Sequence, residues 1–281
     1  MASQACELDR CDTDLRGITR VTTVTPEPRI RLCCFPYAGG GAAVFREWNR
    51  VLAPNIDVCA VRLPGRENRW MEPPFSYLPA LVEHLAVDLH PFSSIPVAFF
   101  GHSMGALIAF ELARQLRRIG ALAPRLLLVS GARAPQRPDP SSPIHHLPTP
   151  AFARELRALA GTPDEVLRNP ELMMLLLPTL RADFALCETY VHVPEAPLDC
   201  SIVAYRGRED AHVNAGDVAA WRYQTSRTFA VRVLPGGHFF LHTARAALLN
   251  AVRDDVLATL DRSATRDGRA TNPAANPAAK P

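Results

Sequence analysis

"FFGHSMGALIAF" (residues 99–110) places the polar sequence GHSMG between two apolar runs. The run before it is typical of a buried strand, and the residues after it keep apolar positions at helical spacing until Gly120. A serine at this junction, with Gly101 and Gly105 on either side, is typical of a sharp, strained turn that lifts a nucleophilic hydroxyl clear of a sheet. The alternative is a packing contact between small residues of a strand and a helix. The segment predicts a strand–turn–helix unit and makes Ser103 a candidate nucleophile.

The same order of strand and helix recurs along the chain. An amphipathic helix pattern at 246–260 closes the series. Short apolar runs that end in turn residues occupy 30–38, 56–65, 96–103, 124–131, 200–207 and 229–237. Because strands alternate with helices, the sequence predicts an α/β fold with a mostly parallel central sheet and helices on both faces.

One region interrupts this alternation. Residues 135–195 show only helical patterns, which predicts an insertion that is either a lid over a site or an extra packing layer. We expect a single domain at 29–262 that contains this insertion. Residues 1–28 are polar and predict a flexible N-terminal segment. Residues 263–281 are rich in Pro, Ala and Asn and predict a disordered C-terminal tail.

The composition excludes several classes of protein. Hydrophobic residues make up 48% of the 281 residues, too many for a mainly disordered chain, and the net charge of +3 is too small to indicate nucleic-acid binding. The seven cysteines lack CxxC spacing, which argues against a disulfide framework and a zinc site and favours buried thiols in a reducing cytoplasm. No apolar run reaches the roughly 18 residues of a membrane span, and the N-terminus is not a signal peptide. We expect a soluble, cytoplasmic protein.

A serine hydroxyl needs an oriented base, and the order of candidates along the chain suggests one. Among nine histidines, His238 follows the last strand pattern in a Gly-rich turn, whereas His102 is expected to pack or hydrogen-bond near the serine. The loop after the preceding strand pattern supplies Asp210 as the acid, with Glu209 as a weaker rival. The order Ser, Asp, His is that of α/β-hydrolases and differs from both serine-protease orders.

The sequence "CFPYAGGGAAVF" (34–45) is a glycine-rich turn after the first strand pattern. It lacks the Lys-Ser/Thr of a phosphate-binding P-loop, and Val44 stands where a dinucleotide fingerprint needs Gly or Ala. We therefore interpret it as an oxyanion loop, in which the backbone N–H of Ala38 pairs with that of Met104. A plain tight turn is the alternative.

With these residues identified, the chain resembles the stand-alone type II thioesterases of polyketide and non-ribosomal peptide assembly lines. The resemblance spans about residues 29–260. It is carried by "FPYAGGGA", "VRLPGRENR" (61–69), "GHSMGALIAFELA", "LLLPTLRADFALCETY" (175–190), "YRGRED" and "PGGHFFL". It implies an α/β-hydrolase fold with nucleophile Ser103, acid Asp210, base His238 and backbone oxyanion donors at Ala38 and Met104.

The resemblance also implies a substrate and a partner. The substrate would be an aberrant or stalled acyl group on the phosphopantetheine arm of an acyl-carrier or peptidyl-carrier domain, and hydrolysis would restore a blocked synthase. No metal or cofactor is implied beyond the phosphopantetheine that the substrate carries, and neither nucleic acid nor membrane is an expected partner. A basic run at Arg114, Arg117 and Arg118 is either a solvated helix face or, less commonly, a docking surface.

The family pattern extends to the surroundings of the site. It implies that 135–195 forms a lid over an acyl channel, with Met173 and Met174 as an adaptable lining; ordinary core packing is the alternative for both. Tyr37, which stands where relatives often have His, is a candidate substrate-binding residue; the change would alter the entrance and not the triad. Arg66 and Glu67, with Arg62, are expected to form ion pairs that brace their loop; a substrate contact is the alternative.

Three other functions stay open on the residues alone. A carboxylesterase or lipase acting on oxygen esters would use the same triad. An excised terminal thioesterase that cyclises its product is the second, although no carrier-like segment precedes the domain. A non-catalytic hydrolase-fold binding module is the third, and the joint presence of serine, acid, histidine and glycine loop argues against it.

Overall fold

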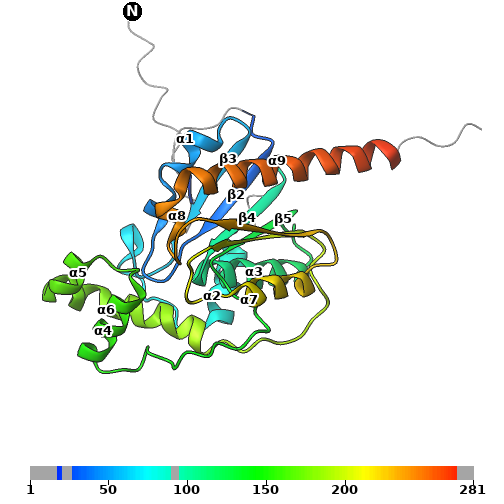
Figure 1. Ribbon diagram of the computed structural model, residues 1–281. Coiled ribbons are helices and arrows are strands. Elements are labelled where there is room, and N and C mark those ends of the chain that lie inside the picture. Colours follow the sequence, from blue (N-terminus) through cyan, green and yellow to red (C-terminus); the bar gives the residue numbers. More distant parts are fainter. Residues whose placement is uncertain (1–17, 21–26, 90–94, 271–281) are drawn as a thin grey trace, which may run out of the picture.

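The computed structural model describes residues 18–20, 27–89 and 95–270, and over these residues seven strands form one sheet (Figure 1). The strands lie in the order β1-β3-β2-β4-β5-β6-β7. Their bounds are β1 Ile18–Arg20, β2 Ile30–Phe35, β3 Ile56–Val61, β4 Val97–His102, β5 Leu126–Ser130, β6 Ser201–Gly207 and β7 Phe229–Leu234. Only β1 runs antiparallel to its neighbour within this described sheet. The prediction of a mostly parallel sheet is confirmed.

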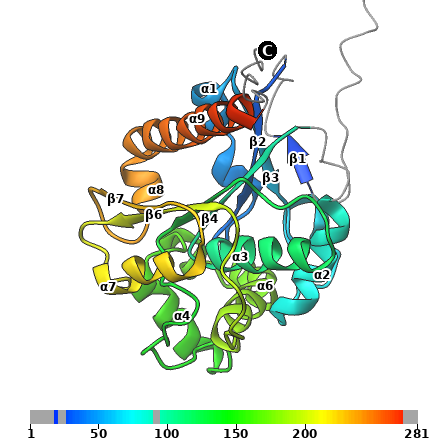
Figure 2. The same cartoon turned by 90° about the vertical axis from the view of Figure 1, so that its right-hand side faces the viewer.

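Helices cover both faces of the sheet, as predicted. α2 (Leu78–Leu89), α3 (Met104–Arg118) and α7 (Ala215–Ala219) lie on one face. α1 (Trp48–Leu52), α8 (Phe240–Thr243) and α9 (Arg245–Ala270) lie on the other, as Figures 1 and 2 both show. Short 3-10 helices η1 (Ala42–Phe45), η2 (Glu67–Arg69) and η4 (Ala220–Gln224) occur in the connections.

The alternation of side chains along β2 divides the core into two clusters. Cys33 and Phe35 pack toward α2 and α3, while Leu32 and Cys34 pack toward α1 and α9. All four side chains are fully buried. A strand covered on both faces is mostly apolar along its length, which is why this run stands out in the sequence; the buried Arg31 of β2 pairs with Asp57 of β3.

The chain between β5 and β6 forms helices and no strand of the sheet. α4 (Thr149–Leu159), α5 (Asp164–Arg168) and α6 (Pro170–Glu188) gather at the lower left of Figure 1. They share a third apolar cluster, made of Phe152, Leu156, Leu167, Met173 and Leu180. This insertion therefore has a small core of its own.

Both ends of the domain differ from the sequence expectation. β1 lies inside the segment 1–28 that was expected to be flexible, because a three-residue strand is too short to give a pattern of its own. α9 continues to Ala270, past the expected domain end at 262, since a helix of this length can continue without an apolar stripe. The rest of the predicted tail, from 271 onward, lies outside the described residues.

Candidate active site

Ser103 occupies a strained turn between β4 and α3. Its φ of +53° is unusual for a residue with a side chain, and α3 begins at the next residue, Met104. The Ser103 N–H donates to the Ser130 carbonyl at 2.8 Å, which ties the turn to the end of β5. The structure thus gives Ser103 the backbone conformation that the GHSMG sequence predicts.

The flanking glycines let the first turn of α3 lie directly on the sheet. A Cβ atom on Gly101 would lie 2.1 Å from the Gly105 carbonyl oxygen, and one on Gly105 would lie 2.1 Å from the Phe35 carbonyl oxygen. These neighbours are backbone atoms, which cannot move aside as a side chain can. Gly105 therefore brings the free N–H groups of the helix N-terminus close to the end of β2.

A histidine and a carboxylate meet at the neighbouring strand ends. Asp210 follows β6 and His238 follows β7, and the pairing of Gly207 with Leu234 brings the two loops together. His238 Nδ1 and Asp210 Oδ2 lie 3.0 Å apart, with the Asp210 side chain wholly buried. This contact fixes the imidazole so that Nε2 can act as a base.

The surroundings of Asp210 keep its carboxylate charged. Burial by itself raises the pKa of Asp210. The hydrogen bond and charge of His238, together with hydrogen bonds from the N–H groups of His212 and Val213, lower it by more. The net result is a lowered pKa. Glu209 has a different role: its carboxylate accepts a hydrogen bond from the Gly236 N–H at 2.5 Å, which braces the turn before His238.

His102 connects the serine turn with the histidine loop. Its ring lies 5.3 Å from the ring of His238, and its Nδ1 lies 3.0 Å from Ser130 Oγ. Burial lowers the pKa of His102 far below its ordinary value, and the charge of His238 adds to this shift. A neutral, buried His102 thus packs between β5 and His238 and brings the Ser103 turn and His238 to one edge of the sheet.

A tight turn at residues 37–40 lies beside this edge, at the end of β2. The Gly40 N–H donates to the Tyr37 carbonyl at 2.8 Å, and Gly39 has a φ of +77°, as the third residue of a type II turn requires. A Cβ atom on Gly105 would also lie 2.7 Å from the Pro36 carbonyl oxygen, so α3 starts against this turn. Met104, the first residue of α3, thus precedes a glycine that lies against Pro36, and the pairing of the Ala38 and Met104 N–H groups as oxyanion donors stays a prediction.

Comparison with known protein families identifies the chain. The model of a thioesterase domain family matches residues 30–256. This protein belongs to the thioesterase domain family. It is therefore an enzyme of the α/β-hydrolase fold that hydrolyses thioester bonds.

Several proteins similar to this thioesterase are named for biosynthetic pathways. The gramicidin S biosynthesis protein GrsT of Aneurinibacillus migulanus is 46% identical over 226 residues, which cover 80% of this chain and 88% of GrsT. The structure of BorB, a type II thioesterase from the borrelidin biosynthetic cluster, is 36% identical with a TM-score of 0.77, over 87% of this chain and 97% of BorB. RedJ, a thioesterase from the prodiginine pathway of Streptomyces coelicolor, is 39% identical with a TM-score of 0.76, over 83% of this chain and 95% of RedJ.

Tyr37 belongs to an aromatic group next to His238 in the thioesterase. Its ring lies 5.9 Å from that of His102 and 5.1 Å from that of Phe239. Burial raises the pKa of Tyr37 and lowers the pKa of His242, with the charge of Arg245 adding to the second shift. Both groups are neutral near pH 7, and the Tyr37 hydroxyl lies 2.9 Å from His242 Nε2. Tyr37 is held at the edge of the site, and its role in substrate binding stays a prediction.

The two methionines predicted to line an acyl channel occupy different environments on α6. Met173 is buried in the apolar cluster of the insertion, whereas the Met174 side chain is 70% exposed. Neighbouring residues of a helix point about 100° apart, so the sequence alone could not separate them. Their contact with a substrate stays a prediction.

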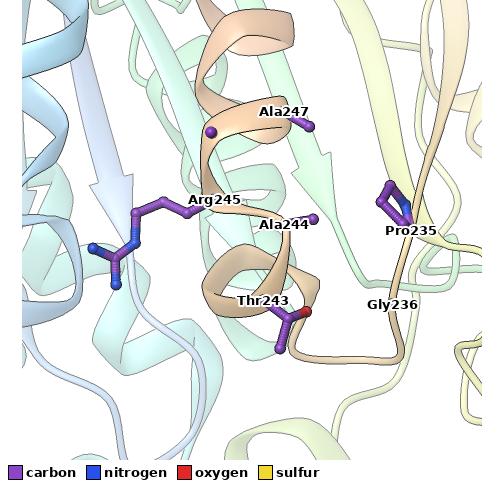
Figure 3. Close-up of a pocket in the computed structure, with 7 residues that line it drawn as sticks. Pro235, Gly236, Thr243, Ala244, Arg245 and Ala247 are labelled. Atoms are coloured by element: carbon purple, nitrogen blue, oxygen red, sulfur yellow. The ribbon is translucent and has the colours of Figure 1, made fainter.

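An open pocket of about 380 Å³ lies between the turn that precedes His238 and the start of α9 (Figure 3). Pro235 and Gly236 line one side, and Thr243 with the residues after it lines the other. The Arg245 side chain points away from Pro235 (Figure 3).

Two further features concern only the described part of the chain. Within those residues no cluster of three or more His, Cys, Asp or Glu side chains is arranged to hold a metal ion. No helix in the same residues combines the length and the apolar character that crossing a membrane requires.

Proposed function

We propose that this thioesterase removes stalled or aberrant acyl groups from the phosphopantetheine arms of acyl-carrier or peptidyl-carrier domains in a polyketide or non-ribosomal peptide pathway. The observation that carries the proposal is the near-complete overlap with BorB, a type II thioesterase from a biosynthetic cluster. GrsT and RedJ, from peptide and prodiginine biosynthesis, support the same class of pathway. The turn at Ser103 and the Asp210–His238 contact supply the chemistry.

The proposed reaction proceeds through an acyl-serine. Ser103 Oγ attacks the thioester carbonyl carbon while His238 Nε2 accepts the hydroxyl proton, and the N–H groups of Ala38 and Met104 stabilise the oxyanion. The carbon–sulfur bond then breaks, and the leaving thiolate takes up the proton that His238 Nε2 had accepted, which returns His238 to its neutral form. Asp210 holds His238 Nδ1–H throughout and stabilises the imidazolium.

A water molecule completes the cycle. His238 removes its proton as the water oxygen attacks the acyl carbon, and the bond to Ser103 Oγ breaks as the proton returns to that oxygen. The products are a free acid and the regenerated serine. Because a thiolate is a good leaving group, the first step needs little protonation by His238.

The carrier domain would dock elsewhere than on the basic run of α3. Arg114, Arg117 and Arg118 all contact the carboxylate of Glu195, at 2.8 Å and 2.7 Å for the first two. The Arg114 side chain is only 3% exposed. These arginines fasten the segment after α6 to α3, so their charge is already engaged within the molecule.

Intact-protein mass spectrometry tests the proposal. Acetyl-, propionyl- and longer acyl-carrier proteins are incubated with the enzyme, with the Ser103→Ala variant as control and a matched oxygen ester in parallel. We expect loss of the acyl mass that depends on Ser103 and is faster than ester cleavage. Intact acyl carriers beside rapid ester cleavage would indicate a general esterase. A folded protein that neither cleaves these substrates nor labels with a serine-reactive probe would indicate a binding module.

A further inference from the structure

Arg66 and Asp183 form a buried ion pair between the loop after β3 and helix α6. Arg66 Nη2 donates to Asp183 Oδ1 at 2.6 Å, and Arg66 Nη1 donates to Oδ2 at 2.9 Å, so the guanidinium grips both carboxylate oxygens. The side chains are 9% and 1% exposed. Desolvation offsets much of the attraction in such a pair, so net stability alone is a poor explanation for it.

Both side chains also hold the backbone of the turn at 37–40. Asp183 Oδ2 accepts from the Gly39 N–H at 2.7 Å, and Arg66 Nη1 donates to the Gly40 carbonyl at 2.9 Å. The two residues thus fix one N–H and one carbonyl of consecutive glycines. The glycine turn, the loop after β3 and α6 are joined through this single ion pair.

The consequence for Ala38 follows from the geometry of the peptide bond. The Tyr37 carbonyl and the Ala38 N–H belong to one planar peptide group and point in opposite directions. The Gly40 N–H holds that carbonyl at 2.8 Å, and Arg66 and Asp183 hold Gly40 and Gly39 in place. The direction of the Ala38 N–H is therefore set by the ion pair through the turn.

The charge of Arg66 matters as well as its shape. A carboxylate hydrogen-bonded to Gly39 lies next to the position where Ala38 would stabilise an oxyanion, and by itself it would oppose that negative charge. The guanidinium of Arg66 neutralises it at the same place. Lysine could supply the charge, but it cannot present the planar fork that binds both carboxylate oxygens and the Gly40 carbonyl.

Two neighbouring contacts strengthen the same junction. The Thr179 hydroxyl, one turn before Asp183 on α6, donates to the Gly65 carbonyl at 2.7 Å. The Glu67 carboxylate accepts from the N–H groups of Ala42 and Ala43, just past the glycine turn. A Cβ atom on Gly39 would lie 2.7 Å from Leu180 Cδ2, so α6 also packs directly on the turn.

We propose that Arg66 and Asp183 are positioning residues that set the direction of the Ala38 N–H, and that they couple the oxyanion donor to the position of α6. This inference rests on the proposed function, because it takes Ala38 as an oxyanion donor in a serine mechanism. A shift of α6 would withdraw Asp183 from Gly39 and release the turn. The insertion would then influence the chemical step and not only access to the site.

The test compares Asp183→Asn and Arg66→Lys with a matched control, Asp57→Asn. Asp57 forms a buried ion pair with Arg31 at 3.0 Å near the amino ends of β2 and β3, away from the site. The readouts are kcat and KM on an acyl-carrier thioester, the thermal midpoint, and the Kd of an alkyl trifluoromethyl ketone. That ketone forms a hemiketal with Ser103, and its oxyanion would occupy the same hole.

We expect kcat of Asp183→Asn and Arg66→Lys to fall about 10- to 100-fold with KM little changed, because the donor is displaced and not removed. The affinity for the ketone should fall by a similar factor. Asp57→Asn should lower the thermal midpoint and leave kcat of the folded enzyme unchanged. If Asp183→Asn fails to fold, Arg66→Lys tests the proposal instead, because lysine keeps a positive charge beside the buried Asp183 carboxylate.

Three results would overturn the proposal: wild-type kcat in the folded variants, a fall in kcat with unchanged ketone affinity, or a loss of activity that merely follows the unfolded fraction. Failure of the proposed function is a separate result. In that case the wild-type enzyme leaves acyl carriers intact, while the ketone comparison still reports whether the ion pair positions the oxyanion donor.

Discussion

At the scale of single residues, the structure separates the roles of Asp210 and Glu209, which are neighbours in the sequence. His238 Nδ1 contacts Asp210 Oδ2 at 3.0 Å, whereas Glu209 accepts from the Gly236 N–H. We expect Asp210→Asn to lower kcat by about 10⁴-fold, because an asparagine amide favours the wrong tautomer of His238. Glu209→Gln keeps an acceptor for Gly236 and should retain most of the activity. Steady-state kinetics of both variants measure this.

If Glu209→Gln lowered kcat more than Asp210→Asn does, Glu209 would be the acid. The carboxamide variants are nearly isosteric, so a circular dichroism spectrum that matches the wild type in both cases would exclude misfolding as the cause. Ser103→Ala serves as the reference for a missing nucleophile.

His102 makes a second prediction at this scale, about pH. The pKa of His102 in the folded protein is far below the ordinary value of about 6.5, mainly because of burial. Below about pH 6.5 the unfolded chain therefore binds a proton at this residue that the folded protein does not bind. The group therefore contributes stability that decreases as pH falls below about 6.5. The slope from this one proton is at most about 1.4 kcal/mol per pH unit.

Urea unfolding between about pH 5 and pH 7 measures this slope. We expect His102→Gln to have a flatter dependence of unfolding free energy on pH than the wild type. His146→Gln, in the helical insertion, is the control and should keep the wild-type slope. Parallel curves for the wild type and His102→Gln would show that His102 does not contribute to acid destabilisation.

The sequence predicted the candidate triad residues but not the ion pair beside them. Ser103, Asp210 and His238 could be selected because each follows a strand pattern, and parallel strands end at one edge of a sheet. The contact between Arg66 and Asp183 could not be predicted, because 117 positions separate the two and Asp183 lies within a helix, away from any strand end. The pattern of a single sequence does not link two such positions.

At the scale of elements, the packing of α3 on β2 depends on Gly105. A Cβ atom there would lie 2.1 Å from the Phe35 carbonyl oxygen, so Gly105→Ala must separate a helix from the central sheet. We expect it to cost about 4 kcal/mol or more of unfolding free energy, at the extreme end of single substitutions. Urea denaturation, or the loss of soluble folded protein, measures the effect.

Gly120 is the matched control for that substitution. It ends α3 in a Schellman motif, in which the Ala121 N–H donates to the Leu116 carbonyl at 2.9 Å and the Gly120 N–H to the Arg117 carbonyl at 3.2 Å. Its φ is +68°, and a Cβ atom would meet nothing within 4 Å. Gly120→Ala should therefore cost only the backbone strain, about 1–2 kcal/mol. Equal costs for the two variants would contradict the argument from close approach.

Elements differed in how well the sequence predicted them. β2 to β6 were predicted because strands buried on both faces form nearly continuous apolar runs. β7 is more exposed, and it was predicted from a short apolar run that ends in turn residues. β1 has three residues and pairs only along one edge of β3, so it leaves no such run. The rotation of α6 was equally hidden, because its helical pattern does not say that Met173 enters the cluster of the insertion and Met174 faces outward.

At the scale of the whole molecule, the described domain combines a sheet core with the separate core of the insertion. Phe152 is fully buried in the insertion, where its ring contacts Phe184 at 5.6 Å and the Arg181 guanidinium lies 4.6 Å from its centre. Phe110 is buried on α3 in the sheet core, against the ring of Trp221. The two phenylalanines allow the cores to be weakened one at a time.

We expect Phe152→Ala to loosen α4 to α6 without unfolding the sheet, because a cavity of this kind costs about 3–5 kcal/mol and that loss falls on a small cooperative unit. Hydrogen exchange followed by mass spectrometry should show faster exchange at 149–188 and unchanged protection in β2 to β6. Phe110→Ala should instead lower protection throughout and reduce the midpoint of global unfolding. If Phe152→Ala weakens the strands as much as Phe110→Ala does, the insertion and the sheet are one cooperative unit, and movement of the insertion alone would not be accessible to the folded enzyme.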